Sequence, residues 1–568
     1  MLQTRILFIS TLLFFISSFL KVQGQGPDCV WAVSFGDTAF DIVNSTMIDN
    51  DGNLYVSGEF EGTIDFDPGP GSYYLSSHGA SDMFISKLDS GGNFIWVREV
   101  GGVYNDFGFD IAIDSASNIY TISASIDTVD VDPGPGVLNY NSQSSYMVIS
   151  KLDSGGNFLW AKQFLGIAGY DGIALDSNRN IYATGVFVGT TDFDPDAGVF
   201  NITTQGSQVK TFILKLDPEG NFLWAKAIQD TSFNSSLSMA VDLSGNVYTT
   251  GFFSGTADFD PDSLATHYIS TTAFEDLFLL KLNTNGEFVW VKVAHGTFYT
   301  QPWSIQADRY GYIYIGGEFR GIVDFDSTGG ISPITATANP DIFIAKSDTS
   351  GNWIWVKQIG SAGMDVCYDI ALDENGNIYT AGYFESTVDF DPGAGAFSLT
   401  SMGDRDIYVS KLDNSGNFIW ARKFGGTGYD DAQSLSVNST GEVYVTGEFL
   451  SPSVIFDSYQ LNMPGASDIF IAKLDTMLIT GSVEIENLSN NVILYPNPAT
   501  NRFWILRGNN NHEMEITISD INGEEIYSGH SKNNDRLVID IDSFSNGIYT
   551  VLIKVSNSSI VKKLVVLK

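Results

Sequence analysis

The residues of this chain whose type and spacing could support metal binding or catalysis are aspartates. They stand two positions apart in recurring copies of an Asp-Phe-Asp-Pro-Gly motif. In an extended segment, both carboxylates of a pair point to one face and the residue between them points to the other. A hard cation such as Ca²⁺ takes several oxygen ligands, which such pairs and neighbouring loop carbonyls could supply. The thirteen aspartates are Asp65, Asp67, Asp130, Asp132, Asp192, Asp194, Asp258, Asp260, Asp324, Asp326, Asp389, Asp391 and Asp457.

A structural role explains the same aspartates without a metal. An Asp carboxylate accepts backbone N–H groups in tight turns, which Pro and Gly favour. Two copies of the motif lose the Pro but keep the second aspartate, as Asp326 and Asp457. The motif also lacks the ligand spacing of a complete calcium loop. We therefore expect structural capping as the main role, calcium binding as the alternative, and no other cofactor.

Catalytic residues are not indicated by the sequence. The histidines stand at unrelated positions without metal-ligand spacing, and no G-x-S-x-G, Walker or H-E-x-x-H motif occurs. Two carboxylates about 5–9 Å apart could hydrolyse glycosides, but many near-equivalent aspartates single out no pair. We expect a protein that is not an enzyme, with a glycoside-acting enzyme as the rival. The histidines are His78, His267, His295, His512 and His530.

Seven tryptophans at intervals of 64 to 66 residues organise the elements that must position these aspartates. A fixed period of this size is typical of repeat architectures, in which each unit cannot bury its own apolar face alone. The period predicts a scaffold of equivalent units between residues 31 and 475. The tryptophans are Trp31, Trp96, Trp160, Trp224, Trp290, Trp355 and Trp420.

Each unit has the pattern of four antiparallel strands. Short alternating segments rich in Val, Ile, Tyr and Phe are separated by Gly-Asn turns, which are strand and hairpin signals. A Tyr and a Lys recur once per unit, as Tyr55 and Lys87 do in the first. A single functional site does not need seven copies, so we expect the lysines to pack between units, each facing a carboxylate.

The two ends of the repeat region predict how the units close. The last unit stops at residues 470–475 and lacks the strand that carries the tryptophan, whereas residues 31–36 carry that strand alone. A first strand that completes the last unit would close a ring and leave no exposed sheet edge. The sequence therefore predicts an all-β fold with a seven-bladed β-propeller of four-stranded antiparallel blades over residues 25–476.

The repeats resemble the SBBP-type β-propeller repeat proteins of bacteria. The pattern D-I-A-x-D-x-x-G-N-x-Y-x-T-G, followed by D-x-F-I-x-K-L-D-x-x-G-N-F-x-W, runs through several units of residues 31–475. The resemblance implies the propeller fold and carries little information about a ligand.

Charge and the first residues indicate an exported protein. The formal net charge is −38, which disfavours nucleic acid as a partner because its binders need clustered Lys and Arg. Residues 1–24 have the positive start, apolar run and small residues of a signal peptide, and we expect no transmembrane span in the mature chain. Cys29 and Cys367 are the only cysteines, and we expect both to be unpaired.

The C-terminal segment has its own strand pattern after a predicted linker over residues 477–490. It begins with Tyr495-Pro-Asn-Pro-Ala, continues through Asn-Gly turns and ends on a basic strand, which predicts a small β-sandwich over residues 491–568. These pieces, in this order, resemble the type A C-terminal sorting domain of the type IX secretion system of Bacteroidota. The resemblance implies that the secretion machinery is a partner and that the protein is secreted or displayed on the outer cell surface.

Together these features predict a secreted or cell-surface propeller that binds a ligand or acts as a scaffold. The face of the predicted propeller that carries the Asp-x-Asp loops is expected to be acidic with interleaved aromatic residues. Such a face suits an extracellular glycan or protein as ligand. A carbohydrate-active enzyme on a propeller and a purely structural surface component are the alternatives.

Overall fold

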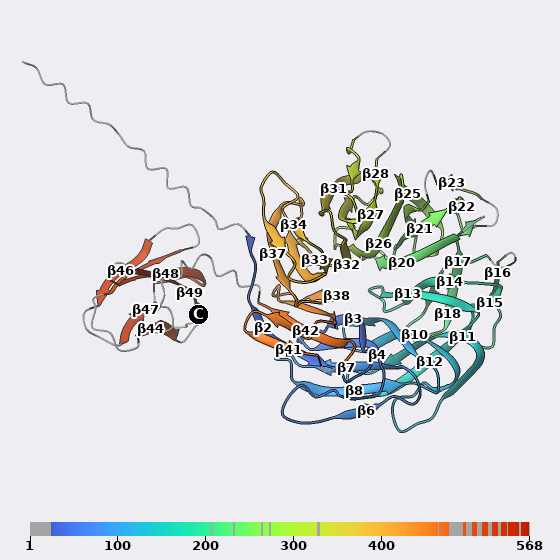
Figure 1. The fold of residues 1–568 in the computed structure, drawn as a ribbon, viewed down its shortest axis with the longest axis horizontal. Helices are drawn as coiled ribbons and strands as arrows, with labels where there is room; N and C mark the ends of the chain where they lie inside the picture. The colour runs from blue at the N-terminus through green and yellow to red at the C-terminus, as the bar shows by residue number, and fades with distance from the viewer. Residues whose placement is uncertain are drawn as a thin grey trace, which may run out of the picture. The chain divides into compact units, whose positions relative to one another are not determined.

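The protein is described by a computed structural model, whose regular elements are all β-strands (Figure 1). The described residues are 24–475 except 205, 207, 231–232, 263–264, 272–273, 327–329 and 464, together with 492–495, 502–507, 514–520, 525–531, 536–541, 543–555 and 558–566. The predicted signal peptide up to residue 23 and the predicted linker, residues 477–490, lie outside them. Two compact units divide the chain, one over Gln23–Leu478 and one that contains Ile479–Lys568.

The first unit is a ring of seven sheets, each built on four antiparallel strands. The first three sheets in chain order comprise β3 (Ile42–Ile48), β4 (Leu54–Phe60), β7 (Asp82–Leu88) and β8 (Phe94–Val100); β9 (Phe107–Ile113), β10 (Ile119–Asp130), β11 (Asn139–Leu152) and β12 (Phe158–Leu165); and β13 (Ile167–Leu175), β14 (Ile181–Phe187), β17 (Lys210–Leu216) and β18 (Phe222–Ala227). The next three comprise β20 (Phe233–Val241), β21 (Val247–Ser254), β24 (Asp276–Leu282) and β25 (Phe288–Gly296); β26 (Tyr299–Ala307), β27 (Ile313–Arg320), β30 (Asp341–Ser347) and β31 (Trp353–Ile359); and β32 (Asp365–Leu372), β33 (Ile378–Phe384), β36 (Asp406–Leu412) and β37 (Phe418–Phe424).

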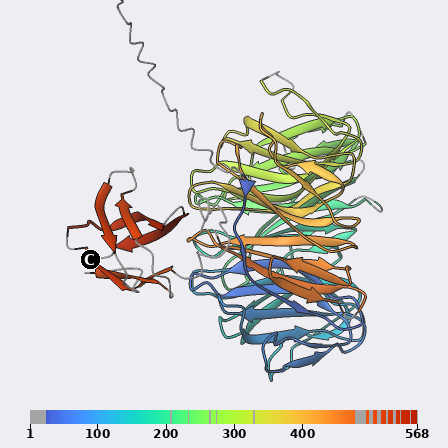
Figure 2. The same ribbon diagram turned by 60° about the vertical axis from the view of Figure 1, so that its left-hand side comes forward.

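The seventh sheet takes its fourth strand from the start of the chain. It contains β38 (Asp430–Val437), β39 (Val443–Phe449), β42 (Asp468–Leu474) and β2 (Cys29–Phe35). Trp31 pairs with Lys473 across β2 and β42, just as Trp96 pairs with Lys87 in the first sheet. The blue N-terminal strand therefore lies beside the orange strands of the last blade (Figure 2).

Short hairpins, which the sequence analysis did not predict, follow the second strand of most blades. These hairpins contain the Asp-x-Asp motifs and extend the blades, and in the second blade they merge with β10 and β11. The hairpin strands are β5 (Thr63–Asp65), β6 (Tyr74–Ser76), β15 (Thr190–Asp192), β16 (Asn201–Thr203), β22 (Thr256–Asp258), β23 (Tyr268–Ser270), β28 (Ile322–Asp324), β29 (Ile334–Thr335), β34 (Thr387–Asp389), β35 (Ser398–Thr400), β40 (Ser453–Phe456) and β41 (Tyr459–Asn462). Two further short strands lie outside the hairpins: β1 (Gly24–Gln25) pairs in parallel with β37, and β19 (Gln229–Asp230) pairs with β22.

The recurring Trp, Tyr and Lys join neighbouring blades. Tyr55 is fully buried, and its ring lies 6.2 Å from that of Trp96 in an edge-on contact. Lys87 places its Nζ 4.6 Å from the Tyr55 ring centre and 3.7 Å from Asp49 Oδ2, and donates a 3.2 Å hydrogen bond to Ser154 O of the next blade. The predicted lysine–carboxylate contact is thus present, and a cation–π contact accompanies it.

The same contact joins the last blade to the first. Lys473 Nζ donates to Ser90 O over 3.2 Å, and Trp31 Nε1 donates to the same carbonyl. The interface between the chain's first and last repeats therefore uses the bonds that join the other blades, which leaves no distinct edge in the ring.

The second unit contains two sheets of its own, as predicted for residues 491–568. Side chains from both sheets, among them Ile505, Ile516, Ile539 and Val551, form one buried cluster, which is the arrangement of a β-sandwich. The strands are β43 (Val492–Tyr495), β44 (Arg502–Arg507), β45 (Met514–Ser519), β46 (Glu525–Ser531), β47 (Arg536–Asp540), β48 (Gly547–Val555) and β49 (Ser558–Val566).

Candidate functional site

A cavity of about 770 Å³ occupies the centre of the ring and is lined by the first strand of every blade. Each of these strands has a β-bulge, and the residue that follows the bulge is small or polar. The resulting polar ring consists of Ser45, Asp110, Gly172, Ser238, Ser304, Asp369 and Ser434.

The two aspartates of the polar ring connect the innermost strands of adjacent blades. Asp369 accepts hydrogen bonds from Ser304 Oγ over 2.8 Å and from Ser434 Oγ over 3.1 Å, so it bridges β26 and β38. Asp110 accepts from Ser45 Oγ over 2.7 Å and from the backbone N–H of Ile173 over 3.0 Å, so it bridges β3 and β13.

Burial raises the pKa of Asp110 to about 6, and hydrogen bonds oppose the shift. The charge of Asp369 raises this pKa further, and the pKa of Asp369 is itself raised, chiefly by burial. Because both oxygens of each side chain accept hydrogen bonds from the surrounding strands, these aspartates hold the ring together.

One residue earlier, at the bulge itself, the blades differ from one another. The bulge residues are Asn44, Phe109, Asp171, Leu237, Trp303, Tyr368 and Gln433. Trp303 and Tyr368 come from adjacent blades, and their rings meet edge-on at 5.6 Å. Tyr383 of β33 continues the row, with its ring 5.7 Å from that of Tyr368.

Arg405 completes this aromatic row on the side of the seventh blade. Its guanidinium lies 4.3 Å from the ring centre of Tyr383 and 4.8 Å from that of Tyr429, so it is held between two aromatic rings. Its Nε is 3.3 Å from Asp431 Oδ1, and its side chain keeps 27% of its surface exposed. We call Trp303, Tyr368, Tyr383, Arg405 and Asp431 the aromatic–arginine cluster.

Two carboxyl groups at this cluster have raised pKa values. Burial raises the pKa of Glu318 to about 7, against a hydrogen bond from Trp303 that lowers it. Burial likewise raises the pKa of Asp431 to about 7; Arg405 opposes this shift, and the nearby Glu448 adds to it. A carboxyl group with a pKa near neutrality can donate as well as accept a hydrogen bond.

The Asp-x-Asp aspartates lie apart from this cluster and bond to their own loops. Asp65 Oδ1 accepts from the backbone N–H of Asp67 over 3.2 Å and of Tyr73 over 2.7 Å, and Asp67 Oδ1 accepts from Gly69 over 2.8 Å. The residue between them, Phe66, is fully buried. This is the geometry of the capping role.

The other copies of the motif repeat the first of these bonds. The second aspartate donates its backbone N–H to the first at 3.0–3.2 Å in the pairs Asp130/Asp132, Asp192/Asp194, Asp258/Asp260, Asp324/Asp326 and Asp389/Asp391. Asp457, the unpaired seventh copy, accepts from Cys29 N over 2.7 Å and pairs with Arg422. Calcium at these loops stays a prediction.

Cys29 and Cys367 are both free and buried, as predicted from the sequence. Burial raises the pKa of each thiol to about 12, which keeps both in the weakly nucleophilic thiol form.

The sequence analysis missed the aromatic–arginine cluster. Its residues come from three blades and span more than 100 positions, and no spacing in the sequence links them. The available signal was that this position carries aromatic residues in two consecutive units, Trp303 and Tyr368, although it differs from unit to unit.

Two family models match the chain. A model described as a secretion system C-terminal sorting domain matches residues 493–567. A model described as a beta-propeller repeat matches residues 95–125 and 354–383. Both resemblances proposed from the sequence are thereby confirmed.

Two curated relatives and one solved structure are similar to the chain only at low identity. An uncharacterized WD repeat-containing protein, L264, of Acanthamoeba polyphaga mimivirus is 23% identical over 509 residues, which cover 75% of this chain and 36% of that protein. Regulatory protein FlaEY of Caulobacter vibrioides is 23% identical over 136 residues, 24% of this chain and 14% of that protein. The chain therefore spans about a third or less of the length of these relatives. A crystal structure of dimeric latent PorU from Porphyromonas gingivalis is 10% identical, with a TM-score of 0.13 over 70% of this chain and 32% of that one.

The sorting domain gives the destination of the protein. Among the residues that the structure describes, no helix is long and apolar enough to cross a membrane. The matched C-terminal domain indicates export by the type IX secretion system, to the cell surface or the medium. The chain thus contains β-propeller repeats, matched over residues 95–125 and 354–383, and a C-terminal secretion sorting domain, matched over residues 493–567.

Proposed function

We propose that the exported propeller is a binding protein whose ligand site is the aromatic–arginine cluster, and that the ligand is a carbohydrate. The observation that carries the proposal is the contact between Trp303 and Tyr368, which stand at the bulge positions of the adjacent fifth and sixth blades. The partly exposed Arg405 extends this row of aromatic rings through its contact with Tyr383.

The chemistry of the cluster suits a sugar. The partly exposed rings of Trp303 and Tyr368 can cover the C–H face of a pyranose ring, because aromatic side chains combine a large apolar area with polar edges, and the buried Tyr383 packs behind Tyr368. Arg405 offers hydrogen-bond donors, and the carboxyl groups of Glu318 and Asp431 offer acceptors for hydroxyl groups. With pKa values of about 7, these carboxyl groups can also donate. A peptide ligand would use the same aromatic rings but leave the paired polar groups without a specific role.

We propose further that the site binds without catalysis. Hydrolysis of a glycoside needs one carboxylic acid and one carboxylate about 5–9 Å apart on either side of the bond. The charge of Glu448 contributes to the raised pKa of Asp431, so these two residues are the carboxyl pair that a hydrolytic enzyme would use here. Arg405 pairs with Asp431, and this contact favours a fixed binding role for Asp431.

The test compares two substitutions at equivalent bulge positions. Trp303→Ala removes an aromatic ring from the cluster, and Leu237→Ala makes the same truncation in the fourth blade, away from it. Binding of a panel of neutral and acidic oligosaccharides to the full chain is measured by titration calorimetry. We expect Trp303→Ala to weaken binding at least about tenfold, since a well-packed aromatic anchor contributes more than about 1.4 kcal/mol, and Leu237→Ala to leave it unchanged.

Three outcomes would contradict the proposal. The full chain could bind none of the oligosaccharides, or the two variants could bind equally well. Release of new reducing ends from a bound oligosaccharide, lost in Asp431→Asn, would show that the site is that of an enzyme instead.

A further inference from the structure

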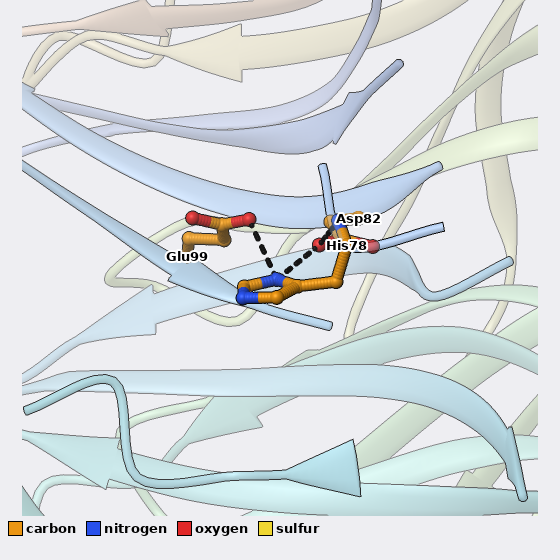
Figure 3. Close-up of side chains that lie close together, drawn as sticks. All are labelled: His78, Asp82 and Glu99. Carbon is orange, nitrogen blue, oxygen red and sulfur yellow. Dashed lines mark hydrogen bonds and ion pairs between the residues drawn. The ribbon is translucent and has the colours of Figure 1, made fainter. Parts of the chain in front are cut away.

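The loop before β7 brings a histidine and two carboxylates together in the first blade (Figure 3). His78 Nδ1 lies 2.9 Å from Asp82 Oδ2 and 3.1 Å from Glu99 Oε1. One ligand atom from each of the three residues lies within 4.8 Å of the others. The sequence analysis found no metal-ligand spacing around any histidine, because Glu99 stands 21 positions after His78 and joins it only through the β7–β8 hairpin.

The other blades serve as internal controls for this cluster. In three blades an aspartate at the start of the third strand caps the loop before it: Asp82 Oδ2 accepts from His78 N over 2.8 Å, and Asp341 Oδ2 accepts from Thr337 N over 3.1 Å. Asp406 Oδ2 accepts from Met402 N over 2.9 Å in the same way. The first blade therefore shares this capping bond with the fifth and sixth blades.

The side chain that faces the capping aspartate differs in the first blade. In the fifth blade, Gln358 Nε2 donates to Asp341 Oδ2 over 2.6 Å, and in the sixth blade Lys423 Nζ lies 3.5 Å from Asp406 Oδ2. Both are donors, as a buried carboxylate requires. The first blade has Glu99 at this position, an acid facing an acid.

Two carboxylates in contact need a proton or a cation between them. Asp82 is fully buried, and its Oδ1 accepts no hydrogen bond from the residues that the structure describes. Glu99 keeps 13% of its side-chain surface exposed and faces Asp82 from the neighbouring strand β8. His78 supplies the third polar atom from the solvent side, with 63% of its side chain exposed.

We propose that His78, Asp82 and Glu99 bind a divalent transition-metal cation of the Zn²⁺ class. An imidazole nitrogen with two carboxylates suits Zn²⁺, whereas Ca²⁺ and Mg²⁺ prefer oxygen ligands alone. Tetrahedral Zn²⁺ with bonds of about 2.0–2.1 Å places its ligand atoms about 3.4 Å apart, close to the two separations observed here. Three protein ligands leave a fourth position open on the solvent side, beside the exposed imidazole.

A substitution drawn from the repeat itself tests the site. Glu99→Gln installs the residue that the fifth blade carries at this position, where it bonds to the capping aspartate, so the blade is expected to fold normally. The matched control is His295→Ala. His295 Nδ1 lies 2.8 Å from the buried Asp276 in the fourth blade, but no cluster of three possible ligands forms there among the described residues.

The full chain is stripped with a chelator and titrated with Zn²⁺, Ca²⁺ or Mg²⁺, and bound metal is counted by mass spectrometry and calorimetry. We expect one equivalent of Zn²⁺ per chain, at least about 100-fold weaker binding in Glu99→Gln and His78→Ala, and unchanged binding in His295→Ala. Zinc should also raise the melting temperature of the full chain and leave that of Glu99→Gln unchanged.

The proposal is overturned by a full chain that binds no Zn²⁺, or by a Glu99→Gln variant that binds it as the full chain does. Equal affinity for Ca²⁺ and Zn²⁺ would also overturn it, because such a site would not depend on the imidazole. If Glu99→Gln loses both metal binding and stability, its circular dichroism spectrum at 20 °C shows whether the variant is still folded.

Discussion

At the scale of single residues, buried carboxyl groups respond to pH most strongly. Asp41 directly precedes the first strand of the first blade, Asp365 begins the first strand of the sixth, and both are fully buried. Burial raises the pKa of each from the ordinary value of 3.8 to about 7, while backbone N–H donors oppose the shift. The folded protein therefore holds protons that the unfolded chain releases at a lower pH.

The sign of the pH dependence follows from these shifts. A carboxyl group with a raised pKa in the folded state contributes stability that is complete below the unfolded pKa, near 4, and is lost as pH rises through about 7. We expect the melting temperature of the full chain to be higher at pH 5 than at pH 8, as measured by calorimetry. Asp365→Asn should reduce this slope, and a melting temperature that rises from pH 5 to pH 8 would contradict the assignment.

At the scale of elements, the contact between blades depends on a glycine in the turn that joins the third and fourth strands. Gly156 has a φ of +74°, and a Cβ at this position would lie 3.1 Å from the Trp96 ring of the preceding blade and 3.1 Å from Arg98 Nε. Arg98 Nε also donates to Gly156 O over 2.8 Å. Several other blades repeat this approach of the indole to a turn glycine, as at Gly92 with Trp31.

Comparing Gly156→Ala with Gly189→Ala distinguishes the stability lost through the Trp96 contact from the stability lost through the left-handed backbone conformation. Gly189 has a φ of +85° with no atom near its Cβ position, so both substitutions cost about 1–2 kcal/mol for the left-handed conformation. Only Gly156→Ala also pushes against Trp96, which adds about 1–3 kcal/mol. Urea denaturation of the full chain should therefore give a lower midpoint for Gly156→Ala. Equal midpoints would show that the indole contact contributes nothing.

At the scale of the whole molecule, the two compact units have separate proposed roles, ligand binding and export. The propeller unit offers a ring of blades with two places of broken symmetry, the aromatic–arginine cluster and the His78 cluster. The sorting domain matches residues 493–567, all of which lie outside the propeller unit, Gln23–Leu478. Binding and export are therefore expected to be separable.

Deletion of residues 491–568 tests this separation in the cell. We expect the truncated protein to accumulate in the periplasm, while the propeller keeps its ligand affinity, as measured by cell fractionation and by binding of the purified protein. A point substitution in the propeller, Trp303→Ala, should leave surface display intact. Normal display of the truncated protein would contradict the role of the C-terminal domain.

The sequence alone determined the blades and the destination of the protein. Tryptophans at a nearly constant period, alternating strands and Gly-Asn turns are local signals, and local hydrogen bonding and side-chain alternation fix each sheet. The capping geometry of Asp65 and Asp67 was predictable for the same reason, because its partners lie within eight positions in the chain. The hairpins that contain these residues were missed, since their strands are only two to four residues long.

Only the tertiary structure showed which residues outside the repeat pattern come together in space to form candidate sites. Trp303, Tyr368 and Arg405 lie in one row because the fifth and sixth blades pack side by side, and Glu99 meets His78 because a hairpin folds back on the preceding loop. Each of these side chains is unremarkable within its own segment of sequence. Their chemistry arises from burial and from neighbours distant in the chain, and neither can be read from the spacing of residues in the sequence.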